Sequence, residues 1–116
     1  MPPQGGSQAS ILDTAQFCAY ILNMKFEWNQ EKNRLNYAKH GMSFEVACKI
    51  FDDPLVTFIF DRVVDEEERW HAVGKVSNLP VLVVVHTYRN NNGEEIIRII
   101  SARQASSHER KRYEQD

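Results

Sequence analysis

The sequence is poor in cysteine, in net charge and in long apolar runs, and each shortage excludes a class of protein. Cys18 and Cys48 form no C-x-x-C pair and no His/Cys cluster, which argues against a zinc site and is typical of a reducing compartment. The formal net charge of -2 gives no global field that would draw the protein onto nucleic acid. No apolar run is long enough to cross a membrane, and the patch at residues 17–22 lacks the basic segment of a secretory signal. We therefore expect a cytoplasmic protein that does not contact a membrane.

Several enzyme motifs are also missing. The sequence contains no Gly-rich phosphate loop, no nucleophile elbow and no metal triad. This excludes nucleotide hydrolases, serine esterases and zinc enzymes, and we expect neither a metal nor another cofactor. A chain of 116 residues can bury one core and has no room for a second.

Charge is unevenly distributed along the chain. Residues 45–68 hold eight acids against two bases, and residues 98–112 hold five bases against one acid. One interpretation is a protein that binds phosphates on one side and a basic partner on the other. The other is simply two solvated faces, and charge alone leaves both open.

The chain is organised around residues 80–103, which we predict to form a β-hairpin. Residues 81–85 are continuously apolar, as in a strand covered on both faces. Residues 90–93 favour a turn, and residues 96–103 form a second strand-like run. The polar residues of this hairpin mark the best place to look for function: His86, Arg89, Arg98 and Arg103.

The remaining elements follow from caps and periodicity. A strand over residues 25–28 leads through the N-cap Asn29 into a helix that ends at Gly41, with Leu35 and Ala38 expected to face the core. A second helix, capped by Ser43, ends at residues 52–54. Strands are expected over residues 55–61 and 68–75, with a polar loop at 62–66, and a last helix follows the capping box formed by residues 106 and 109.

These elements predict an α+β fold in the order β-α-α-β-β-β-β-α. Four consecutive strands with short connections form an antiparallel meander, and the helices should pack on one face of it. We expect residues 24–116 to form the compact domain. Residues 1–23 are expected to be an extension, flexible or helical over 11–22. It is either a genuine extension or upstream sequence read from the wrong start codon, and we favour the second.

A series of short motifs covers nearly all of residues 24–113. They are Phe26-Glu27-Trp28, Lys32, Asn36, Lys39-His40-Gly41, Ser43-Phe44-Glu45, Ala47, Phe51, Asp53-Pro54, Glu68-Arg69, Gly74, Val83-Val84-Val85, Thr87, Arg89, Ile97 to Arg103, Glu109-Arg110 and Tyr113. In the order and spacing of these residues, the sequence from Met24 onward resembles the BrnT toxins of BrnT/BrnA type II toxin–antitoxin systems. Asn29 replaces a common Asp, and His86 replaces a common aromatic residue.

The resemblance implies a RelE-like fold and a ribonuclease that inhibits translation by cleaving mRNA. It also implies a BrnA-like antitoxin, a dimeric arrangement in the complex with it, and contact with DNA only through that antitoxin. An alternative is a catalytically inactive interaction module that acts with a DNA-binding partner as a transcriptional repressor. Direct DNA binding by the last helix is a weaker alternative, because the net charge is near neutral.

Metal-independent RNA cleavage needs a base for the ribose 2′-OH, cations for the charge on phosphorus, and an acid for the leaving 5′-oxygen. Arg98 and Arg103 are candidate catalytic cations and Arg89 a candidate RNA ligand, because a guanidinium is always charged and matches phosphate oxygens. For Arg98 the alternative is a structural ion pair, for example with Glu68.

Candidate acids, bases and further RNA contacts lie elsewhere in the sequence. His40 is a candidate general acid or base, because an imidazole titrates near neutrality; the alternative is a capping role at the helix end where it sits. Glu68 is a candidate base or a partner that orients an arginine, and its alternative is a solvated acid. Lys39, Arg69 and Arg110 are candidate RNA contacts. His71 shares a strand face with Arg69 but carries no stronger signal.

Overall fold

The computed structural model describes residues 16–21 and 24–115, and side chains from residue 24 onward. The chain is a mixed α+β protein. Its elements are β1 (Gln16–Ile21), β2 (Met24–Asn29), α2 (Gln30–His40), α3 (Phe44–Ala47), the 3-10 helix η2 (Cys48–Asp52), β3 (Thr57–Val64), β4 (Glu67–Gly74), β5 (Leu82–Asn91), β6 (Glu94–Gln104) and α4 (Ser107–Gln115). No helix in these described ranges is long and apolar enough to span a bilayer.

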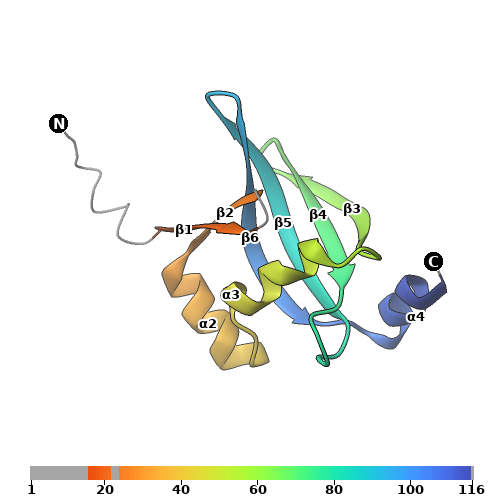
Figure 1. Cartoon of the computed structure of the whole chain (residues 1–116). Coiled ribbons are helices and arrows are strands. Elements are labelled where there is room, and N and C mark those ends of the chain that lie inside the picture. The colour runs from red at the N-terminus through yellow and green to blue at the C-terminus, as the bar shows by residue number, and fades with distance from the viewer. Residues whose placement is uncertain (1–15, 22–23, 116) are drawn as a thin grey trace.

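One six-stranded sheet, in the order β1-β2-β6-β5-β4-β3, forms the centre of the molecule (Figure 1). The strands β3 to β6 form the predicted antiparallel meander. β2 pairs with β6 in parallel, and β1 pairs with β2 in antiparallel orientation. The parallel pair joins two segments far apart in the sequence, and it therefore has no local signature.

The strand β1 corrects the expectation for the N-terminal segment. Residues 16–21 form a strand rather than part of a helix, and its register pairs Gln16 with Asn29 and Ile21 with Met24. The predicted order of elements lacks this strand. The other residues of the expected helix, 11–15 and 22, lie outside the described residues.

Residues 62–66 were predicted to form a polar loop. They belong instead to a tight hairpin between β3 and β4. β3 continues to Val64, which pairs with Glu67, so that only Asp65 and Glu66 form the turn. Both have positive φ, 51° and 68°, which is the backbone of a type I′ turn. Such a turn usually contains Gly or Asn, so the acidic pair Asp65-Glu66 gave no signal from which the turn could be predicted.

The caps of α2 are as predicted, but its buried face is not. The Asn29 side chain accepts a hydrogen bond from the Lys32 N–H at 3.0 Å, and Gly41 ends the helix at φ 69°. Leu35 and Ala38, expected in the core, are exposed, and the buried side chains are Asn33 and Asn36. This helix therefore docks on the sheet through amides rather than through an apolar stripe.

Helices cover both faces of the sheet rather than one. α2, α3 and η2 lie over the main core, which includes Phe26, Phe44 and Val84. Tyr113 of α4 packs instead with Val73 and Val83, in a second cluster. Successive strand residues point to opposite faces, so α4 covers the end of the face opposite α2. This leaves the middle of that second face open.

Candidate functional site

Two β-bulges shape the open face of the sheet. The pairing of β3 with β4 shifts between Phe60 and Arg62, so that Asp61 is an extra residue. The pairing of β5 with β6 shifts between Val85 and His86, so that Ile100 is extra on β6. A bulge re-aims the side chains beside it and is frequent next to active sites.

The bulge at Ile100 decides where the arginines of β6 point. Arg98 pairs with Thr87, and Arg103 pairs with Val83. Thr87 and Val83 are an even number of residues apart and share a face. Arg98 and Arg103 therefore share that face too, although their odd spacing would place them on opposite faces of a regular strand.

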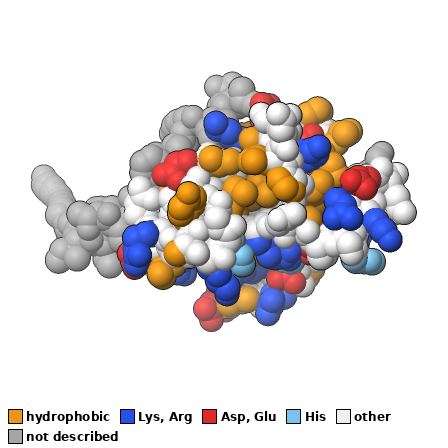
Figure 2. All heavy atoms as spheres, turned by 90° about the horizontal axis from the view of Figure 1, so that it is seen from below, with side chains coloured by type: hydrophobic (Ala, Val, Ile, Leu, Met, Phe, Trp, Pro, Cys, Tyr) orange, Lys and Arg blue, Asp and Glu red, His pale blue; other side chains and the backbone are white. Residues whose placement is uncertain are grey.

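A hollow of about 530 Å³ lies between the two bulges. Both bulge residues line it, together with charged side chains from β3, β4 and β6. Its lining residues are Asp61, Arg62, Val64, Arg69, His71, Val85, Ile100, Ser101 and Arg103. In the view from below, basic, acidic and histidine side chains gather at the lower border of the molecule, apart from an apolar band across its middle (Figure 2).

His71 is the histidine of this hollow, and Asp61 is its acidic neighbour. The Nε2 atom of His71 lies 3.5 Å from Oδ2 of Asp61, and both side chains are mostly buried. Arg62 donates from Nε to the same oxygen at 3.0 Å. This hydrogen bond is the main cause that lowers the pKa of Asp61, so the carboxylate stays ionised and can orient the imidazole.

Two guanidinium groups of the hollow differ in their surroundings. Arg103 donates from Nη1 and Nη2 to the two oxygens of Glu109, at 2.8 and 2.9 Å. The Nε of Arg69 is buried and has no hydrogen-bond partner within the described part of the chain. An unpaired buried donor is costly, so Arg69 is suited to a bound anion.

Arg89 and Arg98 form a separate cluster around Glu27. Arg98 Nη1 lies 3.3 Å from Glu27 Oε2, and Arg89 Nη1 contacts the same oxygen. Glu27 is nearly buried, at 8% exposure. The structural ion pair considered for Arg98 thus exists, with Glu27 as its acid. About 16 Å of strand separates this cluster from Arg103, at about 3.3 Å per residue.

The other predicted site residues do not join the hollow. Lys39 and His40 are exposed at the end of α2. Glu68 is exposed and accepts a hydrogen bond from Trp70 Nε1 at 3.3 Å. Arg110 is exposed on α4, 4.0 Å from Glu114. The structure therefore brings Arg69 and Arg103 together and leaves these four apart.

Asp61, Arg62 and His71 are the charged or titratable residues of the hollow that the sequence did not single out. Alternation along the strand places Arg69 and His71 on one face, and this was the only available signal. Asp61 joins them because of a bulge, which adds one residue without any local pattern. His86, in contrast, is a core residue in ring contact with Phe51, at 5.0 Å between centroids.

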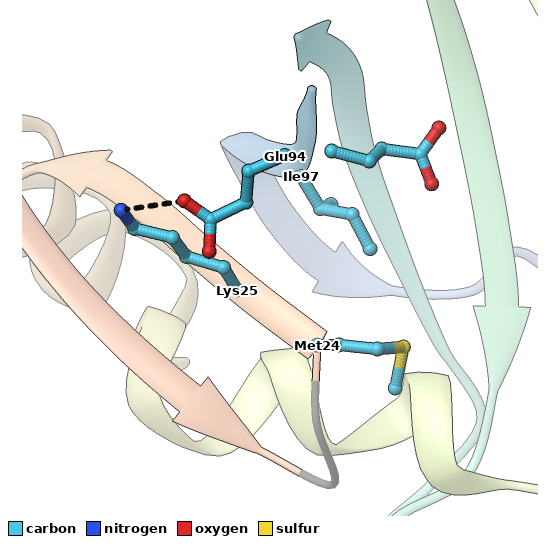
Figure 3. A pocket seen from close by; sticks show the side chains of 5 residues that line it. Met24, Lys25, Glu94 and Ile97 are labelled. Atoms are coloured by element: carbon cyan, nitrogen blue, oxygen red, sulfur yellow. Dashed lines mark hydrogen bonds and ion pairs between the residues drawn. The ribbon is translucent and has the colours of Figure 1, made fainter. Parts of the chain in front are cut away.

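A second, smaller hollow of about 260 Å³ lies where β2 meets β6. It is lined by Met24, Lys25, Glu94, Glu95 and Ile97. Lys25 and Glu94 point toward one another there and form an ion pair at 3.4 Å (Figure 3). Because two acids and one lysine line it, and one of the acids is paired with the lysine, this hollow is poorly suited to a phosphate. Among the described residues, no group of three or more His, Cys, Asp or Glu side chains could hold a metal ion.

The fold and the larger hollow define a small α+β protein with an arginine- and histidine-lined site on its sheet. The chain belongs to the BrnT family, the ribonuclease toxins of type II toxin–antitoxin systems, whose sequence profile matches residues 28–109. Membership of such a system implies an antitoxin partner.

Among solved structures, the chain is similar to the crystal structure of the Brucella abortus ribonuclease toxin BrnT. The two are 25% identical, the match covers 69% of this chain and 94% of that one, and the TM-score is 0.48. Comparison with curated proteins finds no match.

Proposed function

We propose that this chain cleaves mRNA without a metal ion, inhibits translation in the cytoplasm and is neutralised by a BrnA-like antitoxin, within a RelE-like fold. The observation that supports this best is the convergence of His71 with Arg62, Arg69 and Arg103 on one hollow. Such a set places an imidazole, a side chain used in general acid–base catalysis, among fixed cations, which are two of the needs of RNA cleavage.

In this proposal an RNA phosphate lies in the hollow and His71 is the general base. The imidazole takes the proton of the ribose 2′-OH, and the 2′-oxygen attacks phosphorus as the bond to the 5′-oxygen breaks. The leaving oxygen takes a proton from water, which reaches the open hollow. Asp61 orients His71 and stabilises the imidazolium that forms.

The arginines supply the positive charge. Arg69 offers its unpaired Nε, and Arg103 offers a planar fork once the RNA phosphate displaces the Glu109 carboxylate from it. Arg98 and Arg89, on the same face, are proposed to contact the RNA backbone farther along the strand. Lys39, His40, Glu68 and Arg110 stay predictions, and any role they have lies outside the hollow.

Purified variants test this proposal. His71→Ala should lower RNA cleavage by about 10²- to 10⁴-fold, the usual contribution of a general base. Arg69→Ala should lower it by about 10²- to 10³-fold, because a positioned charge on the reacting phosphate is lost. Arg112→Ala, an exposed arginine of α4 outside the hollow, is the matched control and should cleave like the wild type. Cleavage should persist in excess chelator.

Growth on expression of the chain alone separates the two candidate functions. An active toxin arrests growth, and His71→Ala abolishes the arrest. The ion pairs of Arg103 with Glu109 and of Arg98 with Glu27 favour the alternative, an inactive module that acts with a DNA-binding partner. That alternative is correct if the wild type leaves RNA uncut and its expression leaves growth unchanged.

A further inference from the structure

An aromatic surface remains open on the sheet face that carries α2 and α3. Phe58, Phe60 and Tyr88 are 44%, 48% and 40% exposed, although each is a large apolar side chain. Trp70 stands beside Phe60, with ring centroids 5.4 Å apart. We call these four residues the aromatic face. Neighbouring apolar side chains of this size are uncommon on the surface of a protein that works alone.

The aromatic face lies on the opposite side of the sheet from the hollow. Trp70 pairs with His86, whereas His71 pairs with Val85, and successive residues of a strand point to opposite sides. The inner edges of these rings close the core, because His86 packs against Phe58 and Tyr88 with centroids 6.1 and 5.1 Å apart. The outer edges of the rings of the aromatic face pack against no other core residue within the described part of the chain.

Acidic side chains border the aromatic face. Glu68 accepts the hydrogen bond of the Trp70 indole, and the exposed residues 65–67 continue the acidic run through the β3–β4 turn. Glu95 of β6 borders it on the side of Tyr88: it contributes, after burial, to the raised pKa of that phenol. An acidic border repels the phosphates of RNA and attracts a basic partner.

We propose that the aromatic face is the docking surface for a segment of the antitoxin that carries apolar anchors flanked by lysine or arginine. This rests on the proposed function, which makes an antitoxin the partner. Aromatic residues are enriched at the centres of protein interfaces, and charges at the rim select the partner. A second copy of the chain fits less well, because two-fold docking would bring the same acidic border against itself.

The partner lies on the face rather than along the sheet edge. β3 is an edge strand, paired with β4 and with no other strand in the described residues. Its bulge at Asp61 interrupts the regular row of backbone groups that an added strand would need. The exposed rings of Phe58 and Phe60 therefore offer the better anchor sites.

The full chain and the antitoxin encoded beside it, purified separately, provide the test. Phe60→Ser removes an anchor and should raise the Kd of the complex at least about tenfold, as is usual for an aromatic residue at an interface centre. Glu95→Lys should also raise the Kd, and its effect should shrink in high salt. Leu35→Ser, an equally exposed apolar residue on α2, is the matched control and should leave the Kd unchanged.

Three outcomes overturn the inference. In the first, Phe60→Ser and Glu95→Lys both bind the antitoxin like the wild type. In the second, Phe60→Ser dissociates a homodimer seen by sedimentation while antitoxin binding is unchanged, and the face then binds a second copy. In the third, Phe60→Ser weakens RNA binding instead. Glu95 is exposed, so Glu95→Lys keeps the test valid if Phe60→Ser fails to fold.

An RNA-cleavage assay of the same variants distinguishes a failure of this inference from a failure of the proposed function. Free Phe60→Ser should cleave RNA like the wild type, and His71→Ala should bind the antitoxin like the wild type. A wild type that binds the antitoxin through the aromatic face but leaves RNA uncut would contradict the proposed function alone.

Discussion

Glu109, in the first turn of α4, performs two tasks with one carboxylate. Its Oε1 atom accepts a hydrogen bond from the Ser106 N–H at 2.8 Å, and its own N–H donates to Ser106 Oγ at 3.2 Å, which completes the predicted capping box. The same carboxylate holds the fork of Arg103. An RNA phosphate in the hollow must therefore compete with Glu109 for Arg103.

Replacing Glu109 by Gln separates these tasks, since Gln also serves in a capping box but carries no charge. We expect Glu109→Gln to bind RNA several-fold more tightly, because Arg103 is no longer neutralised. Glu114→Gln removes an exposed acid from the same helix and is the control for net charge. Equal RNA affinities of the two variants in a titration would contradict competition at Arg103.

The same substitution should alter the dependence of stability on pH. The hydrogen bond from Arg103 is the main cause that lowers the pKa of Glu109 to about 2, from an ordinary value near 4.5. A depressed carboxyl pKa stabilises the fold above pH 4.5, and this stabilisation is lost as the pH falls toward 2. The stability difference between Glu109→Gln and the wild type should shrink over this window.

How far single residues could be predicted depends on whether their partners are local. Ser106 and Glu109 lie three residues apart, so the capping box was visible in the sequence. Arg103 could be singled out as a charge in an apolar strand. Its partner Glu109 could not, because the capping box already accounted for that carboxylate. Asp61 and His71 meet across two strands through a bulge, and no spacing in the sequence reveals that contact.

At the scale of elements, α2 shows a helix that is held by amides. Asn36 Nδ2 donates to the carbonyls of Met42 and Ala102, both at 2.8 Å, and its Oδ1 accepts from the Ala102 N–H at 3.2 Å. Asn33 Oδ1 accepts from the Phe44 N–H at 2.8 Å and so fixes the start of α3. These contacts tie α2 to β6 and to the next helix.

Asn36→Ala should therefore destabilise the protein by about 3 kcal/mol, because it leaves several buried backbone groups without partners. Leu35→Ala, at a neighbouring but exposed position, should change the free energy of unfolding by no more than about 0.5 kcal/mol. Urea unfolding of both variants measures the difference. A larger loss of unfolding free energy for Leu35→Ala than for Asn36→Ala would instead support the prediction that α2 packs through apolar residues.

Helices and strands, like single residues, could be predicted where their determinants are local and not where these are distant in the sequence. Asn29 and Gly41 act within their own turns, so the ends of α2 could be predicted, and alternation with short connections sufficed for the meander. The buried face of α2 could not, because the usual rule places apolar residues inward and Leu35 points outward. The parallel pairing of β2 with β6 depends on residues some seventy positions apart, such as Lys25 and Ile96.

At the scale of the whole molecule, the sheet separates two kinds of surface. The hollow with its arginines occupies one face, and the aromatic face with its acidic border occupies the other. The uneven charge along the sequence does not map simply onto these faces, because the acids Asp61 and Glu109 lie at the hollow. In the two proposals made above, RNA and antitoxin are therefore recognised on separate faces of one sheet.

His86, in the core beneath the aromatic face, makes the stability of the whole molecule depend on pH. It is fully buried; one ring nitrogen faces the Val84 carbonyl at 3.3 Å and the other the Tyr88 hydroxyl at 3.2 Å. Burial is the main cause that lowers its pKa to about 4, from 6.5, and the hydrogen bond to Val84 only partly opposes it.

A histidine with a depressed pKa stabilises the fold above pH 6.5, and this stabilisation is lost as the pH falls toward 4, because the unfolded chain binds the proton first. We expect the free energy of unfolding to fall by about 2 kcal/mol between pH 7 and pH 5. His86→Leu should flatten this slope, since an apolar side chain of similar size binds no proton. His108→Leu, at an exposed position on α4, should keep it. If His86→Leu retained the wild-type slope in urea unfolding at the two pH values, the proton that destabilises the fold would have to bind at another residue.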